Sequence, residues 1–445
     1  METTAERAAS GAEDGAKHSI GKRILIATFG SLGDLHPYMA IALELRRRGH
    51  VPTIATTENY RANVEAEEIG FAPMRPDVTP LLENPDLAAQ LLDPKYGTER
   101  LIRDYAVPSL RDSYADLKRA AQSADLLITH PLAFAGPMLA EQMKLPWVST
   151  ILTPMSLLSA YDLPRFANAP VASALGSLHP AVGRLVISYG RGIVKKWSEP
   201  IQSFRAEIGL PPAADPLLEG QHSPDLALAL FSPLMASPQP DWPAQMKQTG
   251  FPFYDQSDQR PLPPTLEAFL KSGPPPVVFT LGSAAVLSAG DFYAVSAVAA
   301  PRVNRRGVLL TGSDPKNRPE NLPKNVIAVD YAPYSELFPR AAAVVHSGGI
   351  GTTAQCLRAG KPMLIVPFAN DQFDNAHRIR VAGLGRRCYR NRYNILNVGA
   401  EICRLLNDPP FMKKTKAAGE AVRAENGTMN ACDLIETYLA SRAAN

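Results

Sequence analysis

Residues 23–56 read RILIATFGSLGDLHPYMAIALELRRRGHVPTIAT, an apolar run, a small polar loop, a helical pattern and a second apolar run. The run 24–29 is almost continuously apolar and ends before a glycine, which is typical of a buried parallel strand. We expect Pro37 to open a helix that reaches Arg48, with a further strand over 51–56. The stretch therefore predicts a βαβ unit and an α/β fold.

The same alternation of strand and helix returns along the rest of the chain. Residues 125–129 and 147–152 are expected to be strands, with a helix between them. After a segment dense in prolines, a second series of strands is expected at 277–280, 307–310, 326–329, 343–346 and 363–366. The sequence thus predicts two Rossmann-like domains with parallel sheets facing a central cleft.

The expected divisions of the chain follow from these patterns. They are a disordered tail over 1–21, an N-terminal domain over 22–240, a proline-rich linker over 241–276, a C-terminal domain over 277–430 and a C-terminal helix over 431–445.

The composition limits the classes of function. The 445 residues carry a formal net charge of only +3, which gives no broad electrostatic reason to bind nucleic acid. Residues 1–21 lack the apolar core of a secretory signal, and no apolar run predicts a membrane span. The cysteines form no CxxC pair and no metal-ligand spacing, so reduced thiols in the cytoplasm are expected: Cys356, Cys388, Cys403 and Cys432.

One stretch leaves room for a peripheral location at the inner membrane. Residues 183–197 mix four cations with apolar residues, which predicts a basic amphipathic helix. Such a helix can lie on a membrane surface. The alternative, and the commoner use of this pattern, is a helix of the domain itself with a solvated cationic face.

The most specific chemistry lies in residues 345–355, VHSGGIGTTAQ, where a strand leads into a glycine-rich turn and a helix. Glycines let the backbone approach an anion, and the free N–H groups and dipole of a helix start favour phosphate. His346 and Thr352 add side-chain donors, so the stretch predicts a diphosphate site. The alternative is a tight strand-to-helix turn around a buried histidine.

Two further polar groups follow predicted strands. Asp371 and Gln372 supply the acceptors and donors that sugar hydroxyls require, although Asp371 can instead cap a helix. Asp34, in the loop 30–37 after the first strand, faces the predicted cleft. Its alternative role is to cap the helix that Pro37 opens.

Together these motifs resemble the donor-binding signature of the family 1 nucleotide-sugar glycosyltransferases, which have the GT-B fold. The resemblance covers most of the chain after residue 22, and makes the first domain the acceptor-binding and the second the donor-binding one. It implies that Tyr331 stacks on the nucleotide base, whereas Gln355 replaces the acidic residue that holds the ribose. The implied sugar contacts are Asp371 and Gln372, and the implied diphosphate contacts are Ser283, His346, Gly349, Gly351 and Thr352.

The loop 30–37, GSLGDLHP, resembles the GSxGDxxP loop of the bacterial and sterol-type branches of the family. The aspartate of that loop is their usual general base, so the resemblance gives Asp34 this role. An acceptor hydroxyl needs such a base, because it must lose its proton as it attacks the anomeric carbon. His36 is the second candidate.

The acceptor is expected to meet residues of the first domain. His130 follows a strand and can face the cleft, although a lone histidine there is more often structural. Leu157 and Tyr161 lie in an apolar, irregular segment over 153–220, which is typical of a cleft wall.

The implied reaction is an inverting O-glycosyl transfer from UDP-glucose or dTDP-rhamnose to a hydroxyl of an apolar molecule, namely a flavonoid or phenol, a terpenoid or sterol, or a hydroxy-fatty acid. The rhamnosyl option rests on a resemblance to the rhamnosyltransferases of rhamnolipid synthesis at 157–160, 241–243, 249–252 and 290–294. No cofactor besides the nucleotide sugar and no metal is expected, and the chain is expected to be a monomer or homodimer. The alternatives are a non-hydrolysing nucleotide-sugar epimerase and a non-catalytic accessory chain.

Overall fold

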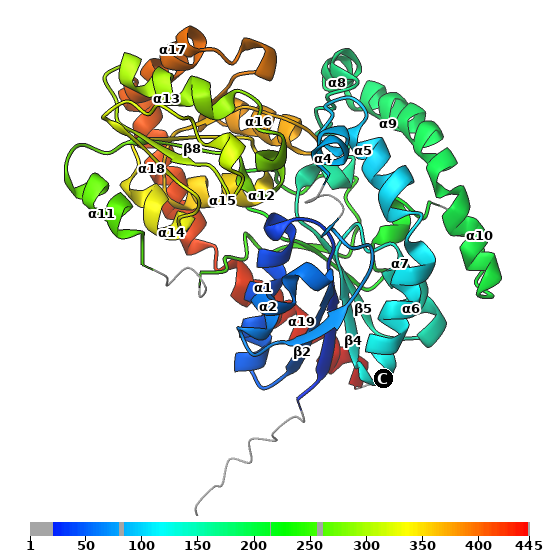
Figure 1. Ribbon diagram of the computed structural model, residues 1–445. Helices are drawn as coiled ribbons and strands as arrows, with labels where there is room; N and C mark the ends of the chain where they lie inside the picture. The colour runs from blue at the N-terminus through cyan, green and yellow to red at the C-terminus, as the bar shows by residue number, and fades with distance from the viewer. Residues whose placement is uncertain (1–20, 80–83, 214, 256–260, 444–445) are drawn as a thin grey trace, which may run out of the picture.

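The computed structural model describes residues 21–79, 84–213, 215–255 and 261–443. Figure 1 shows two α/β lobes, the first in blue to green and the second mainly in yellow to orange. The first lobe holds a seven-stranded parallel sheet of order β3-β2-β1-β4-β5-β6-β7, and the second holds a six-stranded parallel sheet of order β10-β9-β8-β11-β12-β13. The predicted pair of Rossmann-like domains is confirmed.

In the first lobe the strands are β1 (Arg23–Ala27), β2 (Val51–Thr56), β3 (Gly70–Pro73), β4 (Leu126–Thr129), β5 (Trp147–Ile151), β6 (Leu226–Ala229) and β7 (Met246–Gln248). Its helices are α1 (Leu32–Arg47), α2 (Arg61–Glu65), α4 (Pro85–Leu91), α5 (Gly97–Arg100), α6 (Leu110–Ala120), α7 (Ala135–Met143), α8 (Pro170–Gly176), α9 (Pro180–Lys195) and α10 (Glu199–Glu207).

In the second lobe the strands are β8 (Val277–Thr280), β9 (Gly307–Leu310), β10 (Val326–Val329), β11 (Ala343–His346), β12 (Met363–Ile365) and β13 (Gly385–Arg387). The helices that follow the linker are α11 (Pro264–Lys271), α12 (Gly282–Ala285), α13 (Phe292–Arg302), α14 (Tyr334–Leu337), α15 (Ile350–Arg358), α16 (Gln372–Val381), α17 (Ile395–Leu406), α18 (Pro409–Ala424) and α19 (Gly427–Ala443).

The central strand β1 explains why its sequence is apolar without alternation. It lies between β2 and β4, with Ile26 paired to Ile54 on one side and Ile128 on the other. Helices cover both faces of this sheet, so Ile26 and its neighbours are fully buried. The loop that follows therefore emerges at the carboxyl edge of the sheet, facing the second lobe.

Helix α1 begins five residues earlier than expected, at Leu32 rather than at Pro37. Ser31 is its N-cap, and a capping box joins the side chain of Ser31 to the third helical residue, Asp34. This reciprocal cap is a stronger start signal than the proline, which lies inside the helix. The correction places Asp34 in the first helical turn.

Two boundaries also differ from expectation. Strand β7 pairs with β6, so the first sheet extends past residue 240 and the linker begins after Gln248. The C-terminal helix starts at Gly427 rather than at 431 and packs back on the first lobe, with Cys432 and Ile435 buried against α1. The predicted tail lies outside the described residues, except for Gly21.

The chain crosses between the lobes twice, at neighbouring places. After β7 it leaves the first sheet through Gly250 and Phe251, and between α18 and α19 it returns through Gly427. The Asn430 side chain donates to the carbonyl of Thr249 at 2.9 Å. A Cβ on Gly427 would lie 2.5 Å from the carbonyl oxygen of Phe251, so only glycine fits between the two crossings.

No helix in the described part of the chain is both long and apolar enough to span a membrane by itself. One bent pair, residues 282–288 with 292–302, meets the criteria of length and composition, with a bend of 105°.

Candidate functional site

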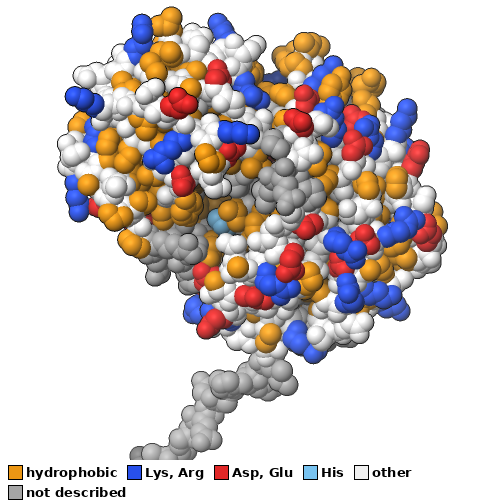
Figure 2. Space-filling model, viewed as in Figure 1, with side chains coloured by type: hydrophobic (Ala, Val, Ile, Leu, Met, Phe, Trp, Pro, Cys, Tyr) orange, Lys and Arg blue, Asp and Glu red, His pale blue; other side chains and the backbone are white. Residues whose placement is uncertain are grey.

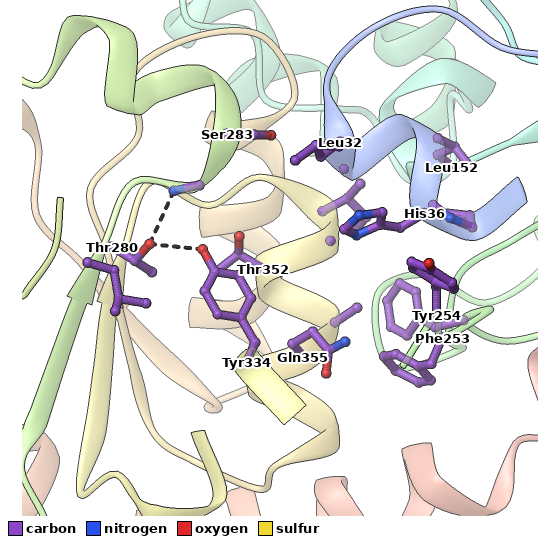
Figure 3. Close-up of a pocket in the computed structure, with 18 of the residues that line it drawn as sticks. Leu32, His36, Leu152, Phe253, Tyr254, Thr280, Ser283, Tyr334, Thr352 and Gln355 are labelled. Atoms are coloured by element: carbon purple, nitrogen blue, oxygen red, sulfur yellow. Dashed lines mark hydrogen bonds between the residues drawn. The ribbon is translucent and has the colours of Figure 1, made fainter. Parts of the chain in front are cut away.

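The cleft between the lobes contains two adjoining cavities, of about 250 and 360 Å³. They share Gly33 from the first lobe and Ser283, Gly351 and Thr352 from the second. Figure 3 shows the smaller cavity, where Leu32 and His36 of α1 lie across from Ser283, Thr352 and Gln355. The first turn of α1 thus meets the glycine-rich start of α15 at the junction of the cavities.

Asp34 lines the larger cavity, and its two carboxylate oxygens have different surroundings. Oδ2 accepts from the backbone N–H of Ser31 at 2.7 Å and from its hydroxyl at 3.0 Å. Oδ1 lies 3.5 Å from Nε2 of His130. Asp34 therefore does cap α1, and it also presents a carboxylate oxygen to the cavity, so the two roles predicted for it are compatible.

His130 supports Asp34 from the end of β4. Its ring is buried, and Nδ1 accepts from the backbone N–H of Leu132 at 3.0 Å. In the neutral ring the proton must therefore be on Nε2, which is the atom nearest Asp34. His130 also lines the larger cavity. The structure places this predicted acceptor contact where it can orient the carboxylate.

His36 lies in the other cavity. Two residues apart on a helix, Asp34 and His36 point to different sides, and the His36 ring lies 5.2 Å from that of Tyr254 in the linker. Burial lowers the pKa of His36 to about 4, so the ring is neutral near pH 7. The structure does not bring this second candidate base next to Asp34.

The glycine-rich start of α15 forms the opposing wall. Gly349 is the N-cap of α15, and Gly349, Gly351 and Thr352 all line the larger cavity. Gly351 lies close to the first lobe, since a Cβ built on it would be 3.6 Å from Cα of Gly33. Free N–H groups at this helix start can therefore approach an anion in the cleft.

His346 ends β11 directly behind this turn, fully buried and outside the walls of both cavities. Its Nδ1 accepts from the backbone N–H of Gly348 at 3.1 Å, whereas Nε2 has no hydrogen-bond partner in the described residues. Burial lowers the pKa of the ring to about 3, so it is neutral with its proton on Nε2. One buried donor is thus left without a partner among the described residues, and the predicted diphosphate contact of His346 does not reach the cavity surface.

Asp371 and Gln372 line the larger cavity at the start of α16. Gln372 is held by its side-chain oxygen, which accepts from the backbone N–H groups of Phe368 at 2.8 Å and Ala369 at 3.2 Å. The Asn375 amide donates to Oδ2 of Asp371 at 2.7 Å. Burial, with a smaller effect of the negative charge of Asp34, raises the pKa of Asp371 to about 7.

This pKa gives a testable pH dependence: Asp371→Asn should stabilise the ligand-free chain, and more at about pH 8 than at about pH 5. The folded carboxyl group keeps its proton up to about pH 7, whereas the unfolded one loses it near its ordinary pKa of 3.8. Wild-type stability therefore falls as pH rises through this window, a loss that the neutral asparagine avoids. Thermal unfolding of both proteins at the two pH values measures the difference. An equal stabilisation at both would contradict the raised pKa.

The remaining predicted donor contacts line the smaller cavity. Tyr331 is 54% exposed there, and Gln355 lies on α15 in the same wall. Tyr334, which sequence reasoning missed, stands beside them, its hydroxyl 2.9 Å from Oγ1 of Thr280. Its position in the sequence, three residues after Tyr331, is the signal that could have indicated a second aromatic residue in this wall.

The acceptor side differs most from expectation. Leu157 is buried in the core and Tyr161 is 45% exposed, and neither lines a cavity. The segment after Ser156 turns away because Asp241 accepts from the Ser159 hydroxyl and from the backbone N–H of Ala160. Only its beginning reaches the larger cavity, so the prediction that 153–220 forms the cleft wall is wrong for most of its length.

The apolar wall comes instead from residues 88–102, which sequence reasoning passed over. Their apolar residues recur at helical spacing, the signal that could have found them. Those lining the larger cavity are Ala88, Leu91, Leu92, Leu101 and Ile102.

Comparisons with known proteins agree with this geometry. Residues 24–161 match the glycosyltransferase family 28 N-terminal domain, and residues 302–432 match the erythromycin biosynthesis protein CIII-like C-terminal domain. The O-mycaminosyltylonolide 6-deoxyallosyltransferase of Streptomyces fradiae is 34% identical over 432 residues, which cover 94% of this chain and 98% of that protein.

Two further relatives differ in length and similarity. A sterol 3-beta-glucosyltransferase of Leptosphaeria maculans is 28% identical over 93% of this chain, which spans only 28% of that longer protein. The crystal structure of glycosyltransferase VinC in complex with dTDP has the same fold, with a TM-score of 0.67 and 21% identity over 94% of this chain and 100% of that one. The chain therefore belongs to the family 1 glycosyltransferases of the GT-B fold, and it is a nucleotide-sugar glycosyltransferase.

Proposed function

We propose that the chain transfers a hexosyl or 6-deoxyhexosyl group, with inversion, from a nucleoside diphosphate to a hydroxyl of an apolar small molecule. The observation that carries the proposal is the position of Asp34. Its carboxylate is held by Ser31 and His130 and faces a cavity whose opposite wall is the glycine-rich start of α15. A base and an anion site across one cleft fit an in-line displacement.

The acceptor half of the reaction is proton removal. The acceptor hydroxyl gives its proton to Asp34 as its oxygen attacks the anomeric carbon. The Nε2–H of His130 keeps the carboxylate directed into the cavity and its negative charge partly compensated. His130 is thus a positioning residue in this proposal.

The donor half is stabilisation of the leaving diphosphate. Negative charge grows on it as the glycosidic bond breaks, and donors fixed in advance stabilise that charge. The N–H groups at the start of α15, with the hydroxyls of Ser283 and Thr352, line the place where it would lie. Tyr331 and Tyr334 would flank the base, and Asp371 and Gln372 would bind the sugar.

The substrates are proposed from the cavity and from the relatives. One relative is named for 6-deoxyallosyl transfer to O-mycaminosyltylonolide and another for glucosyl transfer to a sterol. The apolar wall over 88–102 suits a large acceptor of either kind. We therefore propose a macrolide or other polyketide, or a sterol-like polycycle, as the acceptor, in the cytoplasm, where the buried thiols Cys356, Cys388 and Cys432 stay reduced.

The test is a matrix of donors and acceptors with mass spectrometry of the products. The purified chain is given UDP-glucose, dTDP-rhamnose or another dTDP-6-deoxyhexose, with macrolide, sterol, phenolic and hydroxy-fatty-acid acceptors. A deoxyhexose adduct selects the deoxysugar branch and a hexose adduct the glucosyl branch. An isomerised donor without any acceptor would indicate the epimerase instead. Tight nucleotide binding with no adduct in any pairing would indicate an accessory chain.

Ile102→Trp should discriminate between acceptors by size. Ile102 is half-buried in the wall of the larger cavity and packs against the core of the first lobe, so an indole there fills acceptor space. We expect kcat/KM to fall by about tenfold or more for the largest acceptor, roughly the effect of losing one good pocket contact. Nucleotide affinity should not change. The control Ile102→Val keeps the space open, and an equal loss for the smallest acceptor would contradict the assignment.

A further inference from the structure

The outer flank of the first lobe carries an exposed apolar surface. It runs from α8 along α9 and consists of Leu175, Leu178, Val182, Leu185, Tyr189 and Ile193, here called the α8–α9 face. Leu178, Leu185 and Tyr189 are 77%, 71% and 77% exposed. Figure 2 shows hydrophobic side chains gathered at the upper right, the place of α8 in Figure 1. Exposed apolar patches of this kind mark interaction sites.

The α8–α9 face is separate from the side of α9 that belongs to the core. Along α9, positions 182, 185, 189 and 193 are three or four residues apart and so form one stripe. The opposite side packs inward through Gly183, where a Cβ would lie 2.6 Å from the carbonyl oxygen of Ala160, and through Val194. The helix thus has two apolar sides, of which the core covers one.

The sequence that forms this face carries charges of one sign. Between Asp162 and Glu199 the sequence holds no Asp or Glu. The same stretch holds five cations: Arg165, Arg184, Arg191, Lys195 and Lys196. Arg191 is neutralised by Glu219 at 2.6 Å, whereas Arg184, Lys195 and Lys196 are exposed. An apolar stripe flanked by three exposed cations, unneutralised among the described residues, is complementary to an anionic lipid surface.

A second group of cations adjoins α8 from the other lobe. Nε of Arg165 lies 3.2 Å from Nε2 of His377 on α16, and Arg380 and Arg387 are close enough to act on the same ring. Burial, followed by the positive charges of these arginines, lowers the pKa of His377 to about 4. The next residue along, Phe166, donates its backbone N–H to Ser173 of α8 at 3.1 Å. The cations near the α8–α9 face thus include arginines of the second lobe.

We propose that the α8–α9 face docks on an anionic lipid bilayer, with its apolar stripe in the boundary between headgroups and acyl chains and its cations on the headgroups. The contact is peripheral, because the stripe lies on the surface of α9 and of residues 175–178 just before it. Docking at this face would also affect the acceptor cavity. Residues of the segment 152–156 line that cavity, and the chain continues from them to α8. Docking there would hold the cavity beside the phase in which an apolar acceptor concentrates.

Vesicle flotation of the full chain tests the apolar part. We expect the protein to float with vesicles of phosphatidylcholine mixed with phosphatidylglycerol, and much less with phosphatidylcholine alone. The triple variant Leu178→Ser, Leu185→Ser, Tyr189→Ser should partition at least about tenfold more weakly, since each exposed side chain loses its apolar burial. The matched control Val51→Ser, Leu396→Ser removes side chains that are 56% and 68% exposed elsewhere, and should float like wild type.

The charge part has its own variant. Arg184→Ala, Lys195→Ala, Lys196→Ala should weaken binding to the anionic vesicles several-fold, and added salt should do the same to wild type. Both triple variants should keep full transferase activity on a water-dispersed acceptor, which separates docking from catalysis. Failure of wild type to float with any vesicle overturns the proposal, as does equal binding by the serine variant. A dimer in light scattering that the serine variant abolishes, without vesicle binding, would assign the face to a second copy of the chain.

Discussion

Asp34→Asn should lower kcat by about 10²–10⁴-fold, the usual contribution of a general base, while leaving nucleotide affinity nearly unchanged. The amide is isosteric, and its oxygen can still accept from the backbone N–H of Ser31 as the carboxylate does. The start of α1 is therefore preserved while the proton acceptor is lost. Steady-state kinetics and calorimetric titration with UDP or dTDP measure the two effects.

The control for the capping role is Ser31→Ala. It removes the hydroxyl that caps α1 and contacts Asp34 at 3.0 Å, but keeps the carboxylate. We expect Ser31→Ala to lower the free energy of unfolding by about 0.5–2 kcal/mol. Its kcat should fall much less than that of Asp34→Asn. If Asp34→Asn weakened nucleotide binding as much as turnover, Asp34 would be a structural residue of the cleft and not its base.

Arg378→Met should lower the free energy of unfolding by about 3–5 kcal/mol, the cost of leaving a buried charge unpaired. Arg378 lies on α16, 8% exposed, with Nε 2.6 Å from Oδ2 of Asp374, and it also pairs with Asp162 of the first lobe. Asp374 is 1% exposed, so its charge cannot turn to water when the arginine is gone. Urea unfolding of the ligand-free chain measures the loss.

Two companion variants test this explanation. Arg380→Met removes an exposed arginine from the same helix and should change stability by less than about 0.5 kcal/mol, as surface substitutions usually do. Adding Asp374→Asn to Arg378→Met removes the unpaired negative charge of Asp374. The double variant should therefore recover part of the lost free energy of unfolding. No recovery would mean that Arg378 acts through packing, since its stem is buried as well.

The strands could be predicted because their signal is local. A parallel strand covered on both faces must be apolar throughout, so residues 24–29 and 343–346 were recognisable without knowledge of their partners. The edge strands β3, β7 and β13 were missed because most of their residues are not buried and lack that pattern. Strand β6 was also missed, although its four residues are apolar and buried. The start of α1 was misplaced because Pro37 was preferred over the capping box of Ser31 and Asp34.

The same distinction applies to the site. Asp34 and the residues of the α15 start lie in the first helical turns that follow strands β1 and β11, so the chain itself brings them to the cleft. The acceptor wall depends on contacts between distant segments, such as that of Ser159 with Asp241, which directs residues after 156 to the outside. Residues 88–102 supply apolar lining of the larger cavity. A contact between segments that are far apart in the sequence leaves no pattern in either segment from which it could be predicted.

The position of Gly427 against Phe251 has a consequence for motion. Both covalent connections between the lobes pass through one small region, so the lobes can rotate about it like parts joined by a single hinge. Rotation there changes the width of the cleft at Asp34 while hardly lengthening either connection. Polar contacts between the lobes away from this region include Thr98 to Asn370, Thr153 to Asn375, Arg165 to Asp374 and to His377, and Arg378 to Asp162. Opening of the cleft to release product would then require breaking polar contacts of this set, while the pivot itself stays unchanged.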